Sequence, residues 1–420
     1  MIKQFVCLGF GALMLAGLST PVSAQHWEFH PSFALEQAYN DNVRFAGVEE
    51  GAGISSNGDY ITRFDVALPL ERSWRKGTFS FSYNPSYEKY DRLSDLDQIE
   101  HRVSAGVAAE PNPFTSLSFL ASYVNSQNQG STALASQGIS ADPFLNDRTD
   151  REAMSAQVTL QRDFGARWRW TNSVSANASS FDQADLTEGA TDLSVEDRVG
   201  YGASTGVAMI VGANTAYGLS YGYQLFELDQ SGNGVTQSLA LTVDRGFGRS
   251  ASLTARVGAF SRSFDGGVNE LGGDASLTPA NDDDGLAASL SYSKNLRFVS
   301  VRFGADRRAA LGDSFLGTST NTTFGFTVSS YQTRTWNWQV STRYALRVAT
   351  EDINDDLTTI GVGISADRNF RRPIALRMGL THVDQSGAPG IGGTLDSSQN
   401  ISFYRASVGI VWQPLGRKDS

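Results

Sequence analysis

The stretch Trp336–Arg347, WNWQVSTRYALR, alternates between two kinds of side chain along its whole length. One set is mostly apolar and the other mostly polar: Trp336, Trp338, Val340, Thr342, Tyr344 and Leu346 alternate with Asn337, Gln339, Ser341, Arg343, Ala345 and Arg347. Successive side chains of a β-strand point to opposite faces, so a period of two predicts a strand with one apolar and one polar face.

The same alternation recurs along the chain, and no stretch shows a convincing helical period. Further clear examples are residues 79–84, 286–293, 374–381 and 404–412. The expected strands have about 12 residues, whereas strands of soluble sheets average about 5–6. Their length fits strands that cross a membrane at a tilt, which need about 9–11 residues within the lipid.

Short and long connections alternate between these stretches. Eight short ones are expected near residues 75–77, 111–113, 165–167, 212–214, 246–248, 295, 334 and 371–373. Nine mostly longer ones are expected at residues 40–58, 91–97, 128–148, 182–192, 230–234, 265–284, 310–317, 350–356 and 385–398. The sequence therefore predicts an all-β fold, a transmembrane antiparallel β-barrel of about 18 strands with short periplasmic turns and long extracellular loops, in a bacterial outer membrane. A count of 16 strands is the alternative.

A soluble sandwich, propeller or β-solenoid would show the same alternation. The long strands, the alternating connection lengths and a polar face poor in Lys disfavour it.

Residues 1–24 predict a cleaved signal peptide, with Lys3 before a short apolar run and Val22-Ser23-Ala24 before the cut. Residues 25–420 then form a single barrel, and an N-terminal membrane anchor would need a longer apolar run.

Composition excludes several kinds of site. The formal charge of −10 and pI of about 5.0 argue against a nucleic-acid partner. The single cysteine, Cys7, lies in the expected signal peptide, so the mature chain is predicted to lack disulfides, thiolate metal sites and cysteine catalysis. His26 and His30 are four residues apart without a carboxylate cluster, and we expect no metal and no cofactor.

All seven tryptophans fall close to an expected short turn or a chain end. They are Trp27, Trp74, Trp168, Trp170, Trp336, Trp338 and Trp412. Indole rings favour the membrane–water interface, so this placement predicts a periplasmic aromatic girdle.

The polar face of the expected strands carries many arginines. An anion-leaning lumen lining is predicted from Arg102, Arg151, Arg169, Arg256, Arg302, Arg343, Arg347, Arg377 and Arg405, with Arg262 and Arg308 on the same face. Fewer acids are expected there: Glu36, Asp65, Glu71, Glu88, Asp244, Asp306 and Asp367. Guanidinium groups in a pore suit anionic solutes or an acidic polysaccharide. The alternative is that these arginines pair with lumen acids and brace the wall.

Two further patterns each allow a functional and a structural interpretation. Gly202–Gly206 fits G-x-S-x-G, the nucleophile motif of many hydrolases, but it lies inside an alternating stretch instead of a strand–turn–helix. We therefore expect a non-enzyme, with an outer-membrane lipid hydrolase as a minor alternative.

The long loops are acidic, which fits solvated loops or divalent-cation bridges to lipopolysaccharide.

The first third of the chain resembles a known family. Its motifs are Phe29–Phe33, Tyr39–Val43, Asp59–Ile61, Tyr87–Asp91 and His101–Val103. They are similar to the β-barrel porin family found with exopolysaccharide and PEP-CTERM/exosortase systems. The resemblance covers about residues 27–125 by motif and the rest by strand pattern. One departure is the tail after Trp412, because many outer-membrane barrels end on an aromatic residue.

The resemblance implies an outer-membrane barrel that takes part in polysaccharide export or surface assembly. The expected function is a porin-like channel or export component for exopolysaccharide or anionic solutes. A structural or adhesion barrel with a closed lumen is the alternative. The expected partners are outer-membrane lipid, lipopolysaccharide, the barrel-assembly machinery and polysaccharide export proteins.

Overall fold

A computed structural model describes most of the chain. The described residues are 27–43, 58–126, 149–183, 197–228, 232–248, 250–266, 268–269, 276–277, 281–310, 319–330, 335–349, 357–370, 373–388 and 399–412. The expected signal peptide lies outside them.

Within the described ranges the regular structure is almost entirely β-strand, with one short 3-10 turn, η1 (Ser94–Leu96). The first strands are β1 (Trp27–Phe29), β2 (Ser32–Asn40), β3 (Asp59–Trp74), β4 (Gly77–Tyr90), β5 (Gln98–Asn112), β6 (Thr115–Ser126), β7 (Thr149–Phe164), β8 (Trp168–Gln183), β9 (Arg198–Ile210) and β10 (Thr215–Leu228). They are followed by β11 (Gly232–Phe247), β12 (Ala251–Gly266), β13 (Val268–Asn269), β14 (Ser276–Leu277), β15 (Asn281–Asn295), β16 (Val299–Ala310), β17 (Ser319–Ser330), β18 (Trp336–Ala349), β19 (Leu357–Asn369), β20 (Ile374–Ala388) and β21 (Gln399–Trp412).

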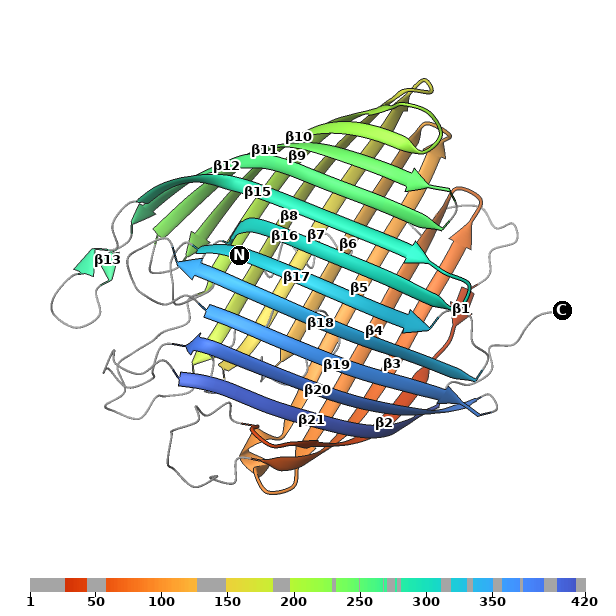
Figure 1. The fold of residues 1–420 in the computed structure, drawn as a ribbon, viewed down its shortest axis with the longest axis vertical. Coiled ribbons are helices and arrows are strands. Elements are labelled where there is room, and N and C mark those ends of the chain that lie inside the picture. Colours follow the sequence, from red (N-terminus) through yellow and green to blue (C-terminus); the bar gives the residue numbers. More distant parts are fainter. Residues whose placement is uncertain are drawn as a thin grey trace.

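The strands close into one antiparallel barrel (Figure 1). Each long strand pairs with its neighbours in sequence, and β2 pairs with β21 to close the ring. Because β1 and β2 both pair with β3, they are two pieces of one wall strand. The wall therefore has 18 strands, and the predicted fold class and strand count are confirmed.

Apolar side chains cover the outside of this barrel instead of its centre. Leu286 is 68% exposed and Val174 is 61% exposed, and both belong to the apolar half of the alternation. No helix among the described residues is long and apolar enough to span a membrane. A closed antiparallel barrel with an apolar outer face is the architecture of bacterial outer-membrane barrels, because closure pairs every wall strand on both sides.

Several expected loops differ from the structure. The connection expected at 385–398 starts later, because β20 runs to Ala388. The connection expected at 230–234 is shorter, since β11 begins at Gly232, where a φ of 103° suits glycine, and its ladder with β10 starts there. The connection expected at 265–284 contains the small hairpin of β13 and β14, and β15 begins at Asn281. Asp282–Asp284 therefore belong to a strand, with Asp283 opposite Arg262 in the register.

Glycines on the inner face give room to two aromatic rings. A Cβ atom on Gly234 would lie 1.8 Å from Cζ of Phe226, and one on Gly285 would lie 2.4 Å from Cζ of Phe260. Phe226 is only 1% exposed, so its ring has little freedom to move away. Covering a strand glycine with a neighbouring aromatic ring restores the packing that the missing side chain would supply.

Gly234→Ala is expected to lower the free energy of unfolding by about 1–3 kcal/mol, because the new methyl group overlaps the buried Phe226 ring. The measurement is urea unfolding of the refolded protein in lipid vesicles, followed by tryptophan fluorescence. Gly325→Ala is the matched control, since a Cβ there meets nothing within 4 Å. Equal unfolding midpoints for the two variants would contradict this account of the packing.

Candidate functional site

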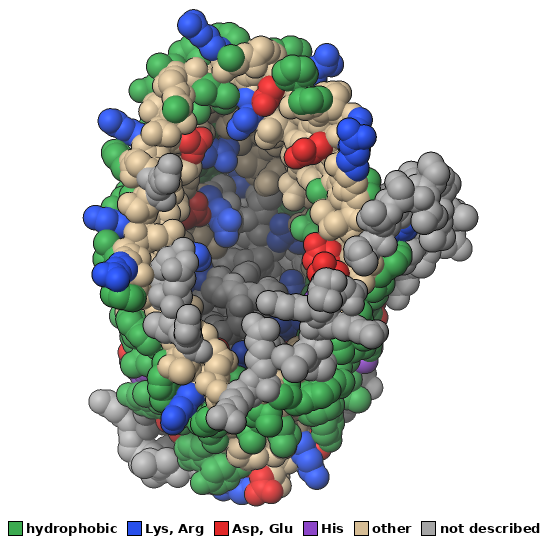
Figure 2. Space-filling model, turned by 90° about the vertical axis from the view of Figure 1, so that its right-hand side faces the viewer, with side chains coloured by type: hydrophobic (Ala, Val, Ile, Leu, Met, Phe, Trp, Pro, Cys, Tyr) green, Lys and Arg blue, Asp and Glu red, His purple; other side chains and the backbone are tan. Residues whose placement is uncertain are grey.

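The interior of the barrel is hollow (Figure 2). A cavity of about 970 Å³ lies against β2, β3 and β15–β21. Its wall is rich in small and hydroxyl side chains, such as Ser291, Thr323, Thr327 and Ser341. A second cavity of about 220 Å³ adjoins β2–β5, β20 and β21. Small residues on the inner face leave the space that a wide barrel needs for a channel.

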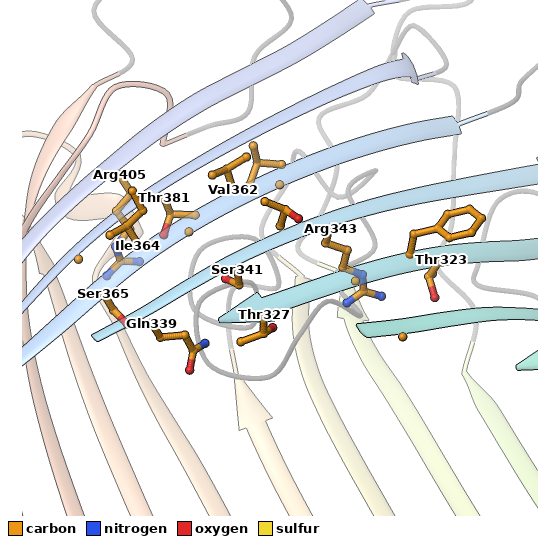
Figure 3. A pocket seen from close by; sticks show the side chains of 18 of the residues that line it. Thr323, Thr327, Gln339, Ser341, Arg343, Val362, Ile364, Ser365, Thr381 and Arg405 are labelled. Atoms are coloured by element: carbon orange, nitrogen blue, oxygen red, sulfur yellow. The ribbon is translucent and has the colours of Figure 1, made fainter. Parts of the chain in front are cut away.

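The arginines expected to line the lumen lie on one face of the wall. Arg343, Arg377 and Arg405 line the larger cavity, and Arg102 and Arg377 line the smaller one. Figure 3 shows Arg343 and Gln339 extending from β18 and Arg405 from β21. The cross-strand register aligns the remaining five with inner-face partners: Arg151 with Ser126, Arg169 with Asp163, Arg256 with Ser289, Arg302 with Thr327 and Arg347 with Asn321.

Charged side chains form a belt across the seam where the barrel closes. In the register, Asp367 lies opposite Arg377, then Gly409, Glu36, Arg63 and Glu88 follow around the wall. Arg377 Nε lies 3.1 Å from Asp367 Oδ1, and Arg63 Nη1 lies 3.5 Å from Glu88 Oε1. Arg405 is on β21, the neighbour of β2, and its Nη2 lies 3.6 Å from Glu36 Oε1. The belt therefore connects the first strands of the barrel to the last.

Glu88 is the most connected acid of this belt. Its side chain is 1% exposed, and its Oε1 lies 3.5 Å from Arg63 and 4.0 Å from Arg405. Its Oε2 accepts hydrogen bonds from Gln98 Nε2 at 2.7 Å and from the Tyr90 hydroxyl at 3.2 Å. A buried carboxylate is tolerable when cations and donors surround it in this way.

Sequence reasoning missed three members of the charged wall, Arg63, Glu100 and Asp163. Arg63 pairs with Asp65 at 2.7 Å, and Arg102 pairs with Glu100 at 2.6 Å. Arg308 and Asp306 are 3.5 Å apart. In each pair the partners are two residues apart on one strand, which places both on the same face. Opposite charges at this spacing were the signal that identifies Arg63 and Glu100. Asp163, which accepts from Arg169 at 2.9 Å, pairs across strands instead.

Several lumen arginines thus have acidic partners, which supports the bracing interpretation for them; they are Arg63, Arg102, Arg169, Arg308, Arg377 and Arg405. Arg256, Arg302 and Arg343 differ, because no carboxylate among the described residues lies within 4.0 Å of their guanidinium nitrogens. Of these three, Arg343 lines the large cavity. It is the strongest candidate for contact with a solute.

The space beside Arg343 is kept open by glycine. In the register, Gly325 of β17 and Gly361 of β19 lie directly opposite Arg343, and Gly304 lies opposite Gly325. A Cβ atom added at Gly304 or Gly325 would meet nothing within 4 Å. The guanidinium therefore has unfilled room along this row of the wall.

The tryptophans lie at the short-turn ends of their strands. Trp74 and Trp412 end β3 and β21, Trp168 and Trp336 begin β8 and β18, and Trp27 begins β1. Trp170 and Trp338 are each two residues further along β8 and β18. Trp27, Trp168, Trp336, Trp338 and Trp412 are among the exposed large hydrophobic residues.

The hydrolase motif lies in the middle of β9, which is continuous through Gly202–Gly206. In the register, Ser204 faces Ser173 and Gly222, so the strand–turn–helix that a nucleophile elbow needs is absent at this place.

His30 lies 3.5 Å from Glu28, while His26 is outside the described residues. Within the described part of the chain, no group of three His, Cys, Asp or Glu residues is arranged to hold a metal ion.

No protein-family model matches the sequence, and no curated protein matches it. Solved structures with a similar fold include OpdQ of Pseudomonas aeruginosa, at 10% identity and a TM-score of 0.46, with 93% of this chain and 98% of that chain covered. The outer membrane protein OpdK of P. aeruginosa is 12% identical, with a TM-score of 0.45 and coverage of 92% and 98%. The ferric-catecholate import receptor Fiu of E. coli K12 is 8% identical, with a TM-score of 0.44 and coverage of 92% and 82%. Similarity at this level transfers neither a solute nor an activity to this chain.

Arg405→Ala is expected to lower the free energy of unfolding by about 3 kcal/mol, because it removes a buried cation from Glu36 and Glu88 at the seam. Arg377→Ala is the matched control on the neighbouring strand. The side chains of Arg377 and its partner Asp367 are 48% and 37% exposed. We therefore expect Arg377→Ala to lower the free energy of unfolding by about 1 kcal/mol or less. Urea unfolding midpoints in vesicles measure both, and a larger loss for Arg377→Ala would contradict the ranking.

Proposed function

We propose that the chain is an outer-membrane channel whose lumen favours small anionic solutes. The observation that carries this proposal is Arg343, which lines the 970 Å³ cavity without a carboxylate within 4.0 Å among the described residues. A guanidinium group binds carboxylate or phosphate oxygens through two parallel hydrogen bonds. The glycines opposite Arg343 leave space for such a group beside the wall.

The surrounding residues support passage better than tight binding. Thr323, Thr327, Ser341 and Gln339 line the same cavity and offer hydroxyl and amide groups to a hydrated solute. Conduction needs an attraction that is strong enough for entry and weak enough for release. The cavity also contains charged residues, but these are paired, as Arg377 is with Asp367 and Arg405 with Glu36. A single guanidinium without a nearby carboxylate meets that requirement better than a cluster of unpaired cations.

Export of an acidic exopolysaccharide is the second candidate, and it comes from the family resemblance. Such a polymer carries carboxylates that the Arg343 site would attract in the same way. Deleting the protein separates the two candidates, because export requires loss of secreted polymer, whereas a diffusion channel requires altered small-solute uptake with the polymer unchanged.

Refolded protein in a planar bilayer under a salt gradient is expected to show stable conductance with a preference for anions. Arg343→Gln should lower the anion-to-cation permeability ratio by about two-fold or more, since it removes an unpaired positive charge from the pore. Arg307→Gln is the control, because its register partner is Ala288 on the outer face, and it should leave the ratio unchanged.

Three results would contradict the proposal. Cation selectivity in the unaltered protein, or an unchanged ratio in Arg343→Gln, would remove Arg343 from the pathway. Absence of conductance from a correctly folded barrel would favour a structural or adhesion barrel with a closed lumen.

A further inference from the structure

Five arginines on the outer face stack on aromatic rings near the short turns. Arg72 lies 5.0 Å from the ring centroid of Trp27, Arg162 lies 5.2 Å from Phe164, and Arg245 lies 5.1 Å from Phe247. Arg297 lies 5.0 Å from Phe298. Arg368 lies 5.3 Å from Trp336 and 5.1 Å from Phe370. We call these five residues the arginine ring.

The arginine ring surrounds one end of the barrel. Arg72, Arg162, Arg245 and Arg368 lie within two residues of the ends of β3, β7, β11 and β19, and Arg297 lies between β15 and β16. All of these strands end on the same side, because alternate strands of an antiparallel barrel run in the same direction. Figure 2, which shows this end, has cations and apolar side chains around the outer rim.

At this end the acids point to the lumen and the arginine ring points away from it. Glu71, Asp163, Asp244 and Asp367 each adjoin a member of the ring in sequence. Neighbouring residues on a strand face opposite sides. Asp163 bonds Arg169, Asp367 bonds Arg377, and Asp244 accepts from Thr254 Oγ1 at 2.7 Å, so these acids are used inside the barrel.

Four of the five outward arginines have no acidic partner within the described part of the wall. Within the described residues, no carboxylate lies within 4.0 Å of the guanidinium nitrogens of Arg162, Arg245, Arg297 or Arg368, and all four are exposed. A guanidinium that stacks on an aromatic face keeps its N–H donors in the ring plane free for oxygen acceptors. The neighbouring aromatic rings set the depth of these groups at the membrane–water boundary.

We propose that the arginine ring binds the phosphate groups of anionic phospholipids in the leaflet at the short-turn end. The ring offers positive charge at headgroup depth on several sides of the barrel, and juxtamembrane cations attract anionic lipid in this way. The chain as a whole is acidic, with a formal charge of −10, so this local excess of outward cations is not a consequence of composition. The preferred lipid is one with a net negative phosphate headgroup, such as phosphatidylglycerol.

The tryptophans at the same end supply the assay. The full mature chain is refolded into vesicles of phosphatidylcholine with brominated acyl chains, which quench tryptophan fluorescence. Unbrominated phosphatidylglycerol or phosphatidylcholine is then added in steps, and the recovery of fluorescence gives their relative binding constant. We expect phosphatidylglycerol to be preferred by about two- to five-fold at low salt, with the preference falling at high salt.

The test variant replaces Arg162, Arg245, Arg297 and Arg368 by Gln, and should bring the relative binding constant close to one. Arg162→Gln with Arg245→Gln is a milder double variant, expected to lose part of the preference. Its matched control is Lys89→Gln with Arg307→Gln, which removes two outer-face charges near the long-loop end and should keep the preference. A folded state is verified by the urea midpoint. Equal binding of the two lipids by the unaltered protein, or a preference that survives in the test variants, would overturn the proposal.

Discussion

Every backbone N–H and C=O group of a wall strand must find a partner, because lipid offers none. Closure between β2 and β21 meets this requirement, and it is the one pairing that joins distant parts of the chain. β2 has nine residues, fewer than its neighbours β3 and β21, so this ladder is short. Side chains reinforce it: Arg405 reaches Glu36 and Glu88, and the Tyr404 N–H donates to Asp41 Oδ1 at 2.7 Å. The charged belt thus reinforces one of the shortest ladders of the wall.

Charge is sorted by face throughout this barrel. Inside, arginines such as Arg102 and Arg377 pair with acids. Arg343 lines the cavity without a carboxylate within 4.0 Å among the described residues, so it can attract a solute. Outside, the arginine ring stacks on aromatic rings at the short-turn end. The same two-residue period produces both results, because an acid and an arginine that are adjacent in sequence are sent to opposite sides of the wall.

The strand pattern was predictable from residues such as 336–347, because apolar and polar side chains alternate there with a period of two. The start of β15 was not, because three consecutive aspartates suggest a loop until the register shows Asp283 opposite Arg262. The pairs of Arg63 with Asp65 and of Arg102 with Glu100 were predictable from their spacing within a strand. The contacts of Arg405 with Glu36 and Glu88 were not, since they cross strands far apart in sequence.

The sequence by itself determined the class of fold, the approximate number of strands, and the face on which each strand residue lies. These follow from local periodicity and connection lengths, which need no knowledge of distant contacts. Only the tertiary structure decided which strands meet at the seam, which arginines have acidic partners, and where the cavity lies. Those properties depend on cross-strand register and on the rotamers of long side chains, both of which are set by closure of the whole ring.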